Sequence, residues 1–201
     1  MIRYAALLLG LLAINGPAAA QAENSLELLK PETTSYLIAR YLLQDPNGRS
    51  VTSEEFIGRY QLITFGYTYC PDICPTTLVE MAAILKLLGD DANQLQTIFI
   101  TVDPERDSGE VLKTYTTFFD PRILPLTGSP ALIRRAADNF KIRYSKVIEP
   151  GAKAGTYAVD HSAGMILLGP DGQYLKKFPF ATPVDEIAAR LRAFMLARQK
   201  P

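Results

Sequence analysis

Cysteine and histidine are scarce in this sequence. Its 201 residues include two cysteines, Cys70 and Cys74, one histidine, His161, and no tryptophan. Two cysteines only four positions apart exclude a disulfide-dense small scaffold, which needs several bridges to replace a hydrophobic core. Any thiol chemistry of the protein must therefore take place at Cys70 and Cys74.

Clustered positive charge is also missing. The chain has 21 Lys and Arg against 21 Asp and Glu, and no basic tract stands out. Nucleic-acid binding depends on clustered basic side chains that neutralise phosphates, so we expect no nucleic-acid partner. No internal repeat and no low-complexity run follows the apolar start of the chain. These absences leave an ordinary globular domain.

The apolar run near the start is too short to span a membrane. It extends from Ala5 to Ile14, about ten residues, whereas a spanning helix needs about 20. Arg3 precedes the run, and a Gly-Pro breaker and a small-residue cleavage site ending at Ala22 follow it, which is the pattern of a secretory signal peptide. We therefore predict a cleaved signal over residues 1–22, a single domain over residues 23–201, and no stable membrane span after cleavage.

Both cysteines lie in the stretch Phe65–Pro75, with the spacing CxxxC. Residues 61–67 are rich in β-branched and aromatic side chains and predict a buried strand, and apolar residues at helical spacing predict a helix over residues 75–88. Pro75 suits the first helical position, with Cys74 at the cap. The positive end of the helix dipole would then favour thiolates over thiols.

The CxxxC spacing leaves two uses open. It would bring the sulfurs of Cys70 and Cys74 onto one side of a helical turn, close enough to share one metal ion or to form a disulfide. A purely structural disulfide is less favoured. Closing so short a ring stabilises a fold by about 2 kcal/mol, against about 4.7 kcal/mol for a ring of about a hundred residues.

The rest of the chain alternates predicted strands with predicted helices and ends in a hairpin followed by a helix. The predicted strands cover residues 36–43, 49–52, 61–67, 96–102, 123–126, 144–148, 165–168 and 174–178. The predicted helices cover residues 75–88, 108–119, 130–140 and 183–198, with a helical turn over residues 53–56 that Ser53 caps. This order predicts an α/β fold with a thioredoxin-like, central mixed sheet flanked by helices on both faces.

His161 is the candidate third ligand. A lone histidine is usually structural, but a glycine-rich segment over residues 149–155 precedes this one, and the neighbouring Tyr157 and Asp160 could orient its imidazole. A structural zinc site prefers four protein ligands, and only Asp72, Asp160 or water offers a fourth. Copper(I) accepts soft thiolates at low coordination number, so two thiolates and one imidazole favour copper.

Two acidic residues, Asp103 and Asp107, follow the predicted strand over residues 96–102. Asp103 would lie at the carboxyl edge of the sheet, where open α/β folds place their sites. In a simpler interpretation, both residues start the helix that follows and complement its dipole. The sequence leaves both interpretations open.

Three motifs together resemble the Sco (SenC/PrrC) family of copper-binding, thioredoxin-like assembly proteins of cytochrome c oxidase. The motifs are FGYTYCPDICPTTL, TVDPERD, and YAVDHS followed by a PDG hairpin. The similarity covers the chain from Arg40 to Arg198 in order. The first motif is highly specific.

The resemblance implies a site and a cofactor. Its metal ligands would be Cys70, Cys74 and His161, with Asp72 and Asp160 as near neighbours. The cofactor would be a copper ion, and the sequence does not distinguish Cu⁺ from Cu²⁺. The metal ligands would lose their function if Cys70 and Cys74 formed a disulfide.

Other parts of the resemblance bear on partners and location. Asp103 and Asp107 match the DxxxD of the family, whose role the sequence does not give. Residues 31–43 lack the Gly-Gly-Pro-Phe type opening strand that is usual in the family. The membrane anchor common among relatives is also missing, so the resemblance implies a free periplasmic protein.

The expected function is copper delivery. The protein would receive copper from an upstream donor, hold it at Cys70, Cys74 and His161, and pass it to the dinuclear copper centre of a cytochrome c oxidase subunit. Such a protein is a metallochaperone rather than an enzyme.

Two alternatives use the thiols without the imidazole. The first is a thiol-disulfide oxidoreductase that reduces the cysteines of the copper-accepting subunit and is itself served by a thiol reductant. The second is a peroxide reductase with Cys70 or Cys74 as the attacking thiolate. His161 discriminates between these classes, because dithiol exchange has no use for a third ligand.

Overall fold

The computed structural model describes residues 40–148, 150, 151, 153 and 156–198. The predicted signal peptide over residues 1–22 lies outside this part of the chain, as do the start of the predicted strand over residues 36–43 and part of the glycine-rich segment over residues 149–155. Among the helices in the described part, none combines the length and the apolar character needed to cross a membrane.

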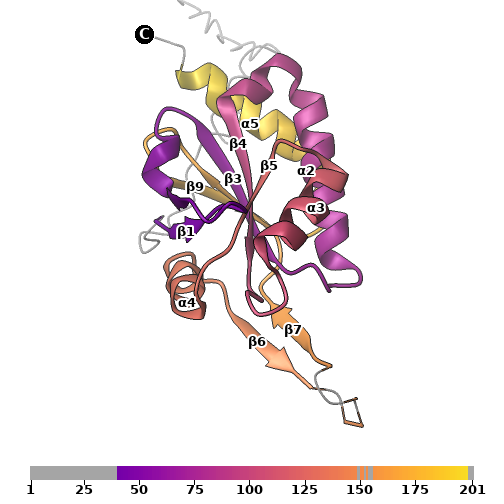
Figure 1. The fold of residues 1–201 in the computed structure, drawn as a ribbon. Coiled ribbons are helices and arrows are strands. Elements are labelled where there is room, and N and C mark those ends of the chain that lie inside the picture. The colour runs from indigo at the N-terminus through magenta and orange to yellow at the C-terminus, as the bar shows by residue number, and fades with distance from the viewer. Residues whose placement is uncertain (1–39, 149, 152, 154–155, 199–201) are drawn as a thin grey trace, which may run out of the picture. The chain divides into compact units, whose positions relative to one another are not determined.

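A five-stranded mixed sheet forms the centre of the fold (Figure 1). Its strands, in spatial order, are β5 (Ile123–Leu126), β4 (Leu95–Thr101), β3 (Tyr60–Gly66), β8 (Met165–Leu168) and β9 (Tyr174–Phe178). β3, β4 and β5 run parallel to one another, whereas β8 pairs antiparallel with both β3 and β9. β3 is the central strand, and all of its residues are buried.

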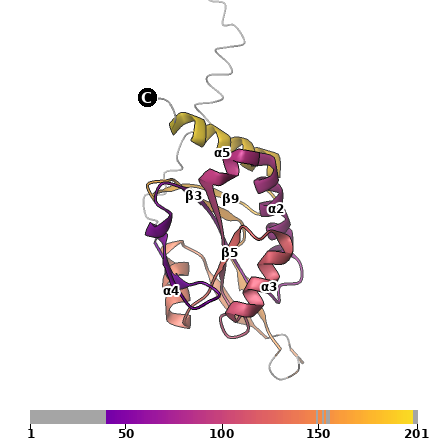
Figure 2. The ribbon, with the colours of Figure 1, turned by 45° about the horizontal axis from the view of Figure 1, so that its top comes forward.

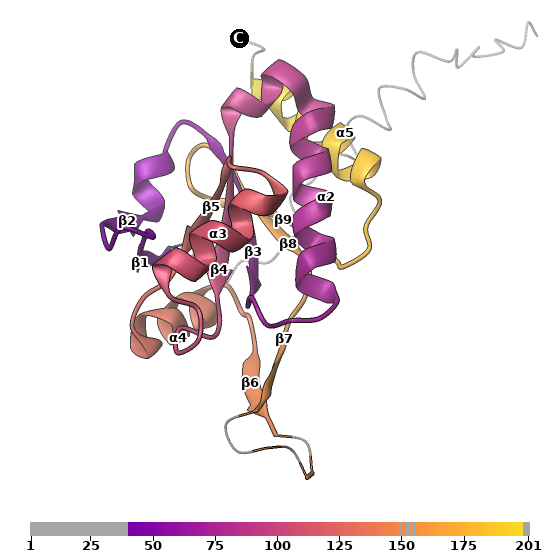
Figure 3. The same ribbon diagram turned by 45° about the vertical axis from the view of Figure 1, so that its right-hand side comes forward.

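Helices cover both faces of this sheet (Figure 2). They are α2 (Ile73–Leu88), α3 (Gly109–Phe119), α4 (Pro130–Asn139) and α5 (Val184–Arg198), with two 3-10 helices, η1 (Ser53–Phe56) and η2 (Gly89–Gln94). α2 and α3 each connect two parallel strands and lie on one face, where α5 packs against α2 (Figure 3). α4 lies on the other face and contacts β1. The predicted thioredoxin-like α/β fold is confirmed.

Alternate residues of β3 and β4 fill the space on the two faces, because successive side chains of a strand point in opposite directions. On the α4 side, the rings of Phe65 and Phe140 have centroids 5.7 Å apart. On the α3 side, the rings of Phe99 and Tyr115 have centroids 6.0 Å apart. Burial on both faces explains why apolar residues occupy successive positions in the middle of β4, from Ile98 to Ile100.

A short hairpin of β1 (Leu42–Gln44) and β2 (Ser50–Thr52) lies outside the main sheet. The Asp45 carboxylate closes its turn by accepting the backbone N–H groups of Asn47 and Arg49 at 2.9 and 3.0 Å. Gly48 adopts a positive φ of 79°, which glycine tolerates without strain. The predicted turn and its return strand are confirmed.

A second hairpin, of β6 (Tyr144–Val147) and β7 (Ala158–His161), was not predicted as a pair. Its two strands form a separate antiparallel sheet in which Tyr144 is paired with His161. The hairpin extends from the end of the main sheet at which α2 begins (Figure 3). It therefore brings the only histidine of the chain to the end of the sheet that carries the cysteines.

Four predicted helix starts differ from the structure, and one of them is α5, which begins at Val184 rather than at residue 183. α2 begins at Ile73, with Asp72 at the cap, rather than at Pro75 with Cys74 at the cap. η1 has Thr52 rather than Ser53 at its cap. α3 has Ser108 at its cap, and the Ser108 hydroxyl oxygen accepts the N–H of Val111 at 3.3 Å. Asp103 and Asp107, which were considered as the start of this helix, therefore do not cap it.

Candidate metal centre

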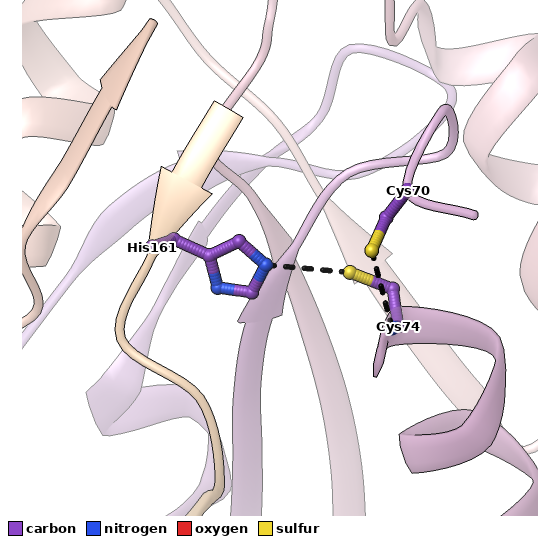
Figure 4. Close-up of side chains that lie close together, drawn as sticks. All are labelled: Cys70, Cys74 and His161. Carbon is purple, nitrogen blue, oxygen red and sulfur yellow. Dashed lines mark hydrogen bonds between the residues drawn. The ribbon is translucent and has the colours of Figure 1, made fainter. Parts of the chain in front are cut away.

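Cys70, Cys74 and His161 come together at one end of the sheet (Figure 4). Their sulfur and imidazole nitrogen atoms all lie within 4.8 Å of one another. The cysteines come from the turn after β3 and the first turn of α2, and His161 comes from the last position of β7. The fold thus assembles, from distant parts of the sequence, the three side chains that the sequence singled out.

The distances between the donor atoms suit a shared ion. The Cys74 sulfur lies 3.4 Å from Nε2 of His161, and the Cys74 backbone N–H points to the Cys70 sulfur at 3.4 Å. That N–H is one of those in the first helical turn that have no partner within the helix. Sulfur and nitrogen ligands of one zinc ion, at about 2.0–2.3 Å each, lie no more than about 4.6 Å apart. Small side-chain movements would therefore close this cluster around one ion of similar size.

The environment of His161 prepares one nitrogen as a ligand. Its Nδ1 lies 3.2 Å from the carbonyl oxygen of Ser162, which can only accept a hydrogen bond. The proton therefore resides on Nδ1, and the lone pair of Nε2 is directed toward Cys74. Burial lowers the pKa of His161, although the Ser162 carbonyl and the charge of Asp160 oppose this shift. The imidazole is thus neutral near pH 7, the form that binds metal ions.

Cys74 is more deeply buried than its position at a helix start suggested. Its residue is 3 % exposed, and burial raises the pKa of its thiol, against a hydrogen bond from the Tyr67 backbone. The prediction that the helix start favours a thiolate is therefore wrong for Cys74, because burial disfavours the charged form of its thiol. Both cysteines are free thiols in this structure, so metal binding must release a proton from Cys74.

The absence of a side chain at Gly66 leaves room for the Cys74 sulfur. A Cβ atom at this position would lie 2.8 Å from the Cys74 sulfur and 2.8 Å from a ring carbon of Phe99, and neither approach is tolerable. Gly66 is the last residue of β3, so the central strand ends against the sulfur. Gly66 lies within the FGYTYCPDICPTTL motif, but nothing in the sequence alone marks it as a residue of the site.

A surface hollow of about 470 Å³ gives access to the cluster. Cys70 and His161 line it, and so do Asp72 and Asp160, the two acidic residues expected near the ligands. Both acidic side chains are exposed. Cys70 is less buried than Cys74, so an approaching protein meets Cys70 and His161 first.

Tyr157 lies close to the centre but does not orient the imidazole. Its hydroxyl group donates to the Asp103 carboxylate at 2.8 Å, while the Ser162 carbonyl takes the His161 ring proton. Asp103 is buried and also accepts a hydrogen bond from Arg106. Arg106 lies in the TVDPERD motif, but no ligand spacing or periodic pattern in the sequence marks it as a functional residue.

Asp107 secures the turn that leads to the cysteines. Its buried carboxylate accepts the Thr68 N–H at 3.1 Å and hydroxyl hydrogen bonds from Thr68 and Thr101, each at 2.6 Å. Burial raises the pKa of Asp107, against these hydrogen bonds, which favour the charged form. Asp103 and Asp107 thus lie behind the metal centre, and neither belongs to the three-residue cluster.

Comparisons with known proteins agree with one another. The family model described as SCO1/SenC matches residues 30–196. A "SCO2-like protein" of Rickettsia felis is 39% identical over 75% of this chain and 73% of its own length. The structure of Bradyrhizobium japonicum ScoI with copper bound matches with a TM-score of 0.71 and 39% identity, covering 77% of this chain and 97% of that chain.

A further solved structure is described by both a function and a redox property. It is the structure of BsSco, a member of the Sco family of cytochrome c oxidase assembly proteins in which a disulfide switch was identified. The match has a TM-score of 0.61 and 28% identity, and it covers 83% of this chain and 97% of that chain.

The contact between Gly66 and Cys74 leads to a first prediction. In Gly66→Ala, the new methyl group must displace the Cys74 sulfur or the buried Phe99 ring, so we expect the free energy of unfolding to fall by about 1–3 kcal/mol. Metal affinity should fall as well, because the sulfur moves away from His161. Urea unfolding of the reduced protein and competition with a metal chelator measure the two effects.

Gly128→Ala is the matched control. Its Cβ atom would lie 3.4 Å from the nearest atom, a side-chain carbon of Leu43, which is an ordinary contact. We expect its free energy of unfolding to change by no more than about 0.5 kcal/mol. Equal metal affinity in the two variants would contradict the inference that Gly66 allows the Cys74 sulfur its position.

Proposed function

This chain belongs to the SCO1/SenC family, and on that premise we propose that it binds copper at Cys70, Cys74 and His161 and serves in the assembly of cytochrome c oxidase. The observation that carries the proposal is the convergence of these three donor atoms within 4.8 Å. Two relatives support it. ScoI was solved with copper bound, and BsSco belongs to a family of oxidase assembly proteins.

The chemistry of the donor set supports copper over zinc. Thiolates are soft ligands that select copper(I), which is stable at low coordination number. A structural zinc ion prefers four protein ligands, and the described residues offer one three-residue cluster at this place. Asp72 and Asp160 line the hollow beside it, but both are exposed to water and neither joins the cluster.

Delivery requires that copper can leave, and the three ligands differ in how firmly they are held. Cys74 is buried against Gly66, Cys70 lines the surface hollow, and His161 lies on a hairpin outside the main sheet. An acceptor cysteine entering the hollow would bind copper as a thiolate while His161 leaves as a neutral imidazole. Further acceptor ligands would then displace Cys70 and Cys74, whose thiolates take up protons again, so the copper ion passes between proteins through shared ligands with no change of oxidation state. Its acceptor would be the copper-binding subunit of the oxidase.

A second candidate function is reduction of a disulfide in the acceptor. The observation that favours it is the pair of free thiols whose sulfur atoms lie within 4.8 Å. The Cys70 thiolate would attack the acceptor disulfide and form a mixed disulfide, which Cys74 would resolve. The products are a Cys70–Cys74 disulfide and two acceptor thiols, and an external thiol reductant would restore the starting state. The disulfide switch identified in BsSco supports this candidate.

The proposed location is the periplasm. The apolar start of the sequence supports export, with cleavage after Ala22 leaving residues 23–201 as one domain. N-terminal sequencing of the protein recovered from the periplasmic fraction would identify the cleavage site.

The oxidation state of the cysteines should control copper binding. We predict that the reduced protein binds one copper ion and that the oxidised protein binds almost none, because a Cys70–Cys74 disulfide removes both thiolates. Thiol titration alongside metal analysis of the same samples checks this. Undiminished copper binding by the fully oxidised protein would eliminate the two-thiolate site.

Replacing His161 should separate the two candidate functions. His161→Ala removes one ligand and leaves the dithiol in place. We expect lower copper affinity and failed oxidase assembly at limiting copper, with little change in the midpoint potential of the dithiol or in its exchange with a small disulfide. Chelator competition, oxidase activity in cells and redox titration provide the readouts.

Two kinds of control variant complete this experiment. His161→Met introduces a soft thioether of similar reach, so it should recover part of the copper(I) affinity that His161→Ala loses. Cys70→Ser and Cys74→Ser should abolish both copper binding and disulfide exchange. If His161→Ala still supports oxidase assembly at low copper, the reductase is the better account and His161 is structural.

A further inference from the structure

Arg106 lies between the two halves of the metal centre, on the turn between β4 and α3. Its guanidinium carbon lies 3.7 Å from the ring centroid of Tyr157, 4.7 Å from that of Tyr69 and 5.7 Å from that of Tyr67. Tyr67 and Tyr69 belong to the turn that carries the cysteines, and Tyr157 directly precedes β7. One cation therefore packs against rings from both sides of the centre.

Hydrogen bonds fasten the same contact. Nη1 of Arg106 donates to the Tyr157 carbonyl oxygen at 2.9 Å, and Nε donates to the Asp103 carboxylate. The other oxygen of that carboxylate accepts the Tyr157 hydroxyl hydrogen bond at 2.8 Å. The Asp103 side chain is fully buried. Arg106, Asp103 and Tyr157 form a closed ring of polar contacts, which we call the Arg106 clamp.

The hairpin that carries His161 needs such a clamp. β6 and β7 pair with each other and form a sheet of two strands, which is marginally stable by itself. Val159 of β7 packs into the core, and Arg134 stacks on Tyr144 at 3.8 Å. The ion pair of Lys146 with Glu105, at 2.6 Å, is exposed and so contributes little. The Arg106 clamp is a part-buried polar contact, centred on the fully buried Asp103, between the residues that lead into β7 and the turn before α3.

A second path connects the clamp to the imidazole. The ring of Tyr67 packs edge-on against His161, with centroids 5.9 Å apart, and Arg106 lies over the same Tyr67 ring. Loss of the guanidinium would thus loosen both the hairpin and the ring that supports His161. A lysine cannot replace it, because the planar guanidinium stacks and donates two hydrogen bonds at once.

We propose that Arg106 is a positioning residue. Through its contacts with Asp103 and Tyr157, it holds the β6–β7 hairpin where His161 meets the cysteines. The inference rests on the proposed copper function, since it gives His161 the role of a ligand. Arg106 touches none of the donor atoms itself, so its effect on copper passes through His161.

A double-mutant cycle on copper(I) affinity tests this route. Arg106→Gln should weaken binding by about 10- to 100-fold, the usual effect of removing a partner that orients a ligand. In the His161→Ala background, the same change should alter the affinity by no more than about twofold, because the ligand it positions is gone. Arg106→Lys should resemble Arg106→Gln. Equal losses in the two backgrounds would overturn the proposal.

Hydrogen exchange of the reduced, metal-free protein provides a readout that needs no copper. Arg106→Gln should speed amide exchange in β6 and β7 while leaving β3 and β4 unchanged. Arg122→Gln is the matched control, since Arg122 bonds Asp120 at the surface and should leave the hairpin unaffected. Unchanged exchange in the hairpin of Arg106→Gln would also overturn the proposal.

A milder variant keeps the test decisive if Arg106→Gln does not fold. Tyr157→Phe removes one hydroxyl group and its bond to Asp103, and it should shift copper affinity and hairpin exchange in the same direction by a smaller amount. If Tyr157→Phe changes neither, the clamp has no positioning role. Failure of the wild-type protein to bind copper would instead refute the proposed function, while the exchange data would still judge the clamp.

Discussion

The position of one sulfur atom, that of Cys74, determines how the rest of the centre can be built. It is buried between the end of the central strand and the first turn of α2, and a glycine at position 66 is required for the approach. From this place the sulfur lies 3.4 Å from Nε2 of His161. This distance requires that β3, the start of α2 and the β6–β7 hairpin are all correctly placed. The fold and the set of candidate ligands therefore depend on each other.

The three candidate ligands differ in how firmly the fold holds them and in how easily a partner can reach them. Cys74 is desolvated, Cys70 lines a surface hollow, and His161 belongs to a hairpin that is separate from the main sheet. A permanent metal site would gain from holding all three firmly. In the proposed delivery, a site from which a partner takes the ion needs one ligand that leaves readily, and His161 on the hairpin would be that ligand. In this proposal, the polar contacts around Arg106 and Asp107 would keep the cysteine turn and the hairpin together between transfers.

Local patterns predicted the sheet, the helices and the three side chains that converge at its end, because apolar periodicity and rare residue types are visible along the chain. The pairing of β6 with β7 was missed, since most of β6 is exposed and shows no alternation. α2 can begin before Pro75, because the N–H groups of the first helical turn have no partner within the helix. A proline in that turn therefore costs no hydrogen bond. The burial of Cys74 and the hydrogen bond between Tyr157 and Asp103 arise from contacts distant in sequence.

X-ray absorption of the copper(I)-loaded, reduced protein tests the central claim most directly. If Cys70, Cys74 and His161 hold the ion, its fine structure requires two sulfur scatterers and one nitrogen scatterer with the outer-shell pattern of an imidazole. The imidazole pattern should disappear in His161→Ala. A wild-type spectrum without imidazole scattering, or with fewer than two sulfur atoms, would contradict the account.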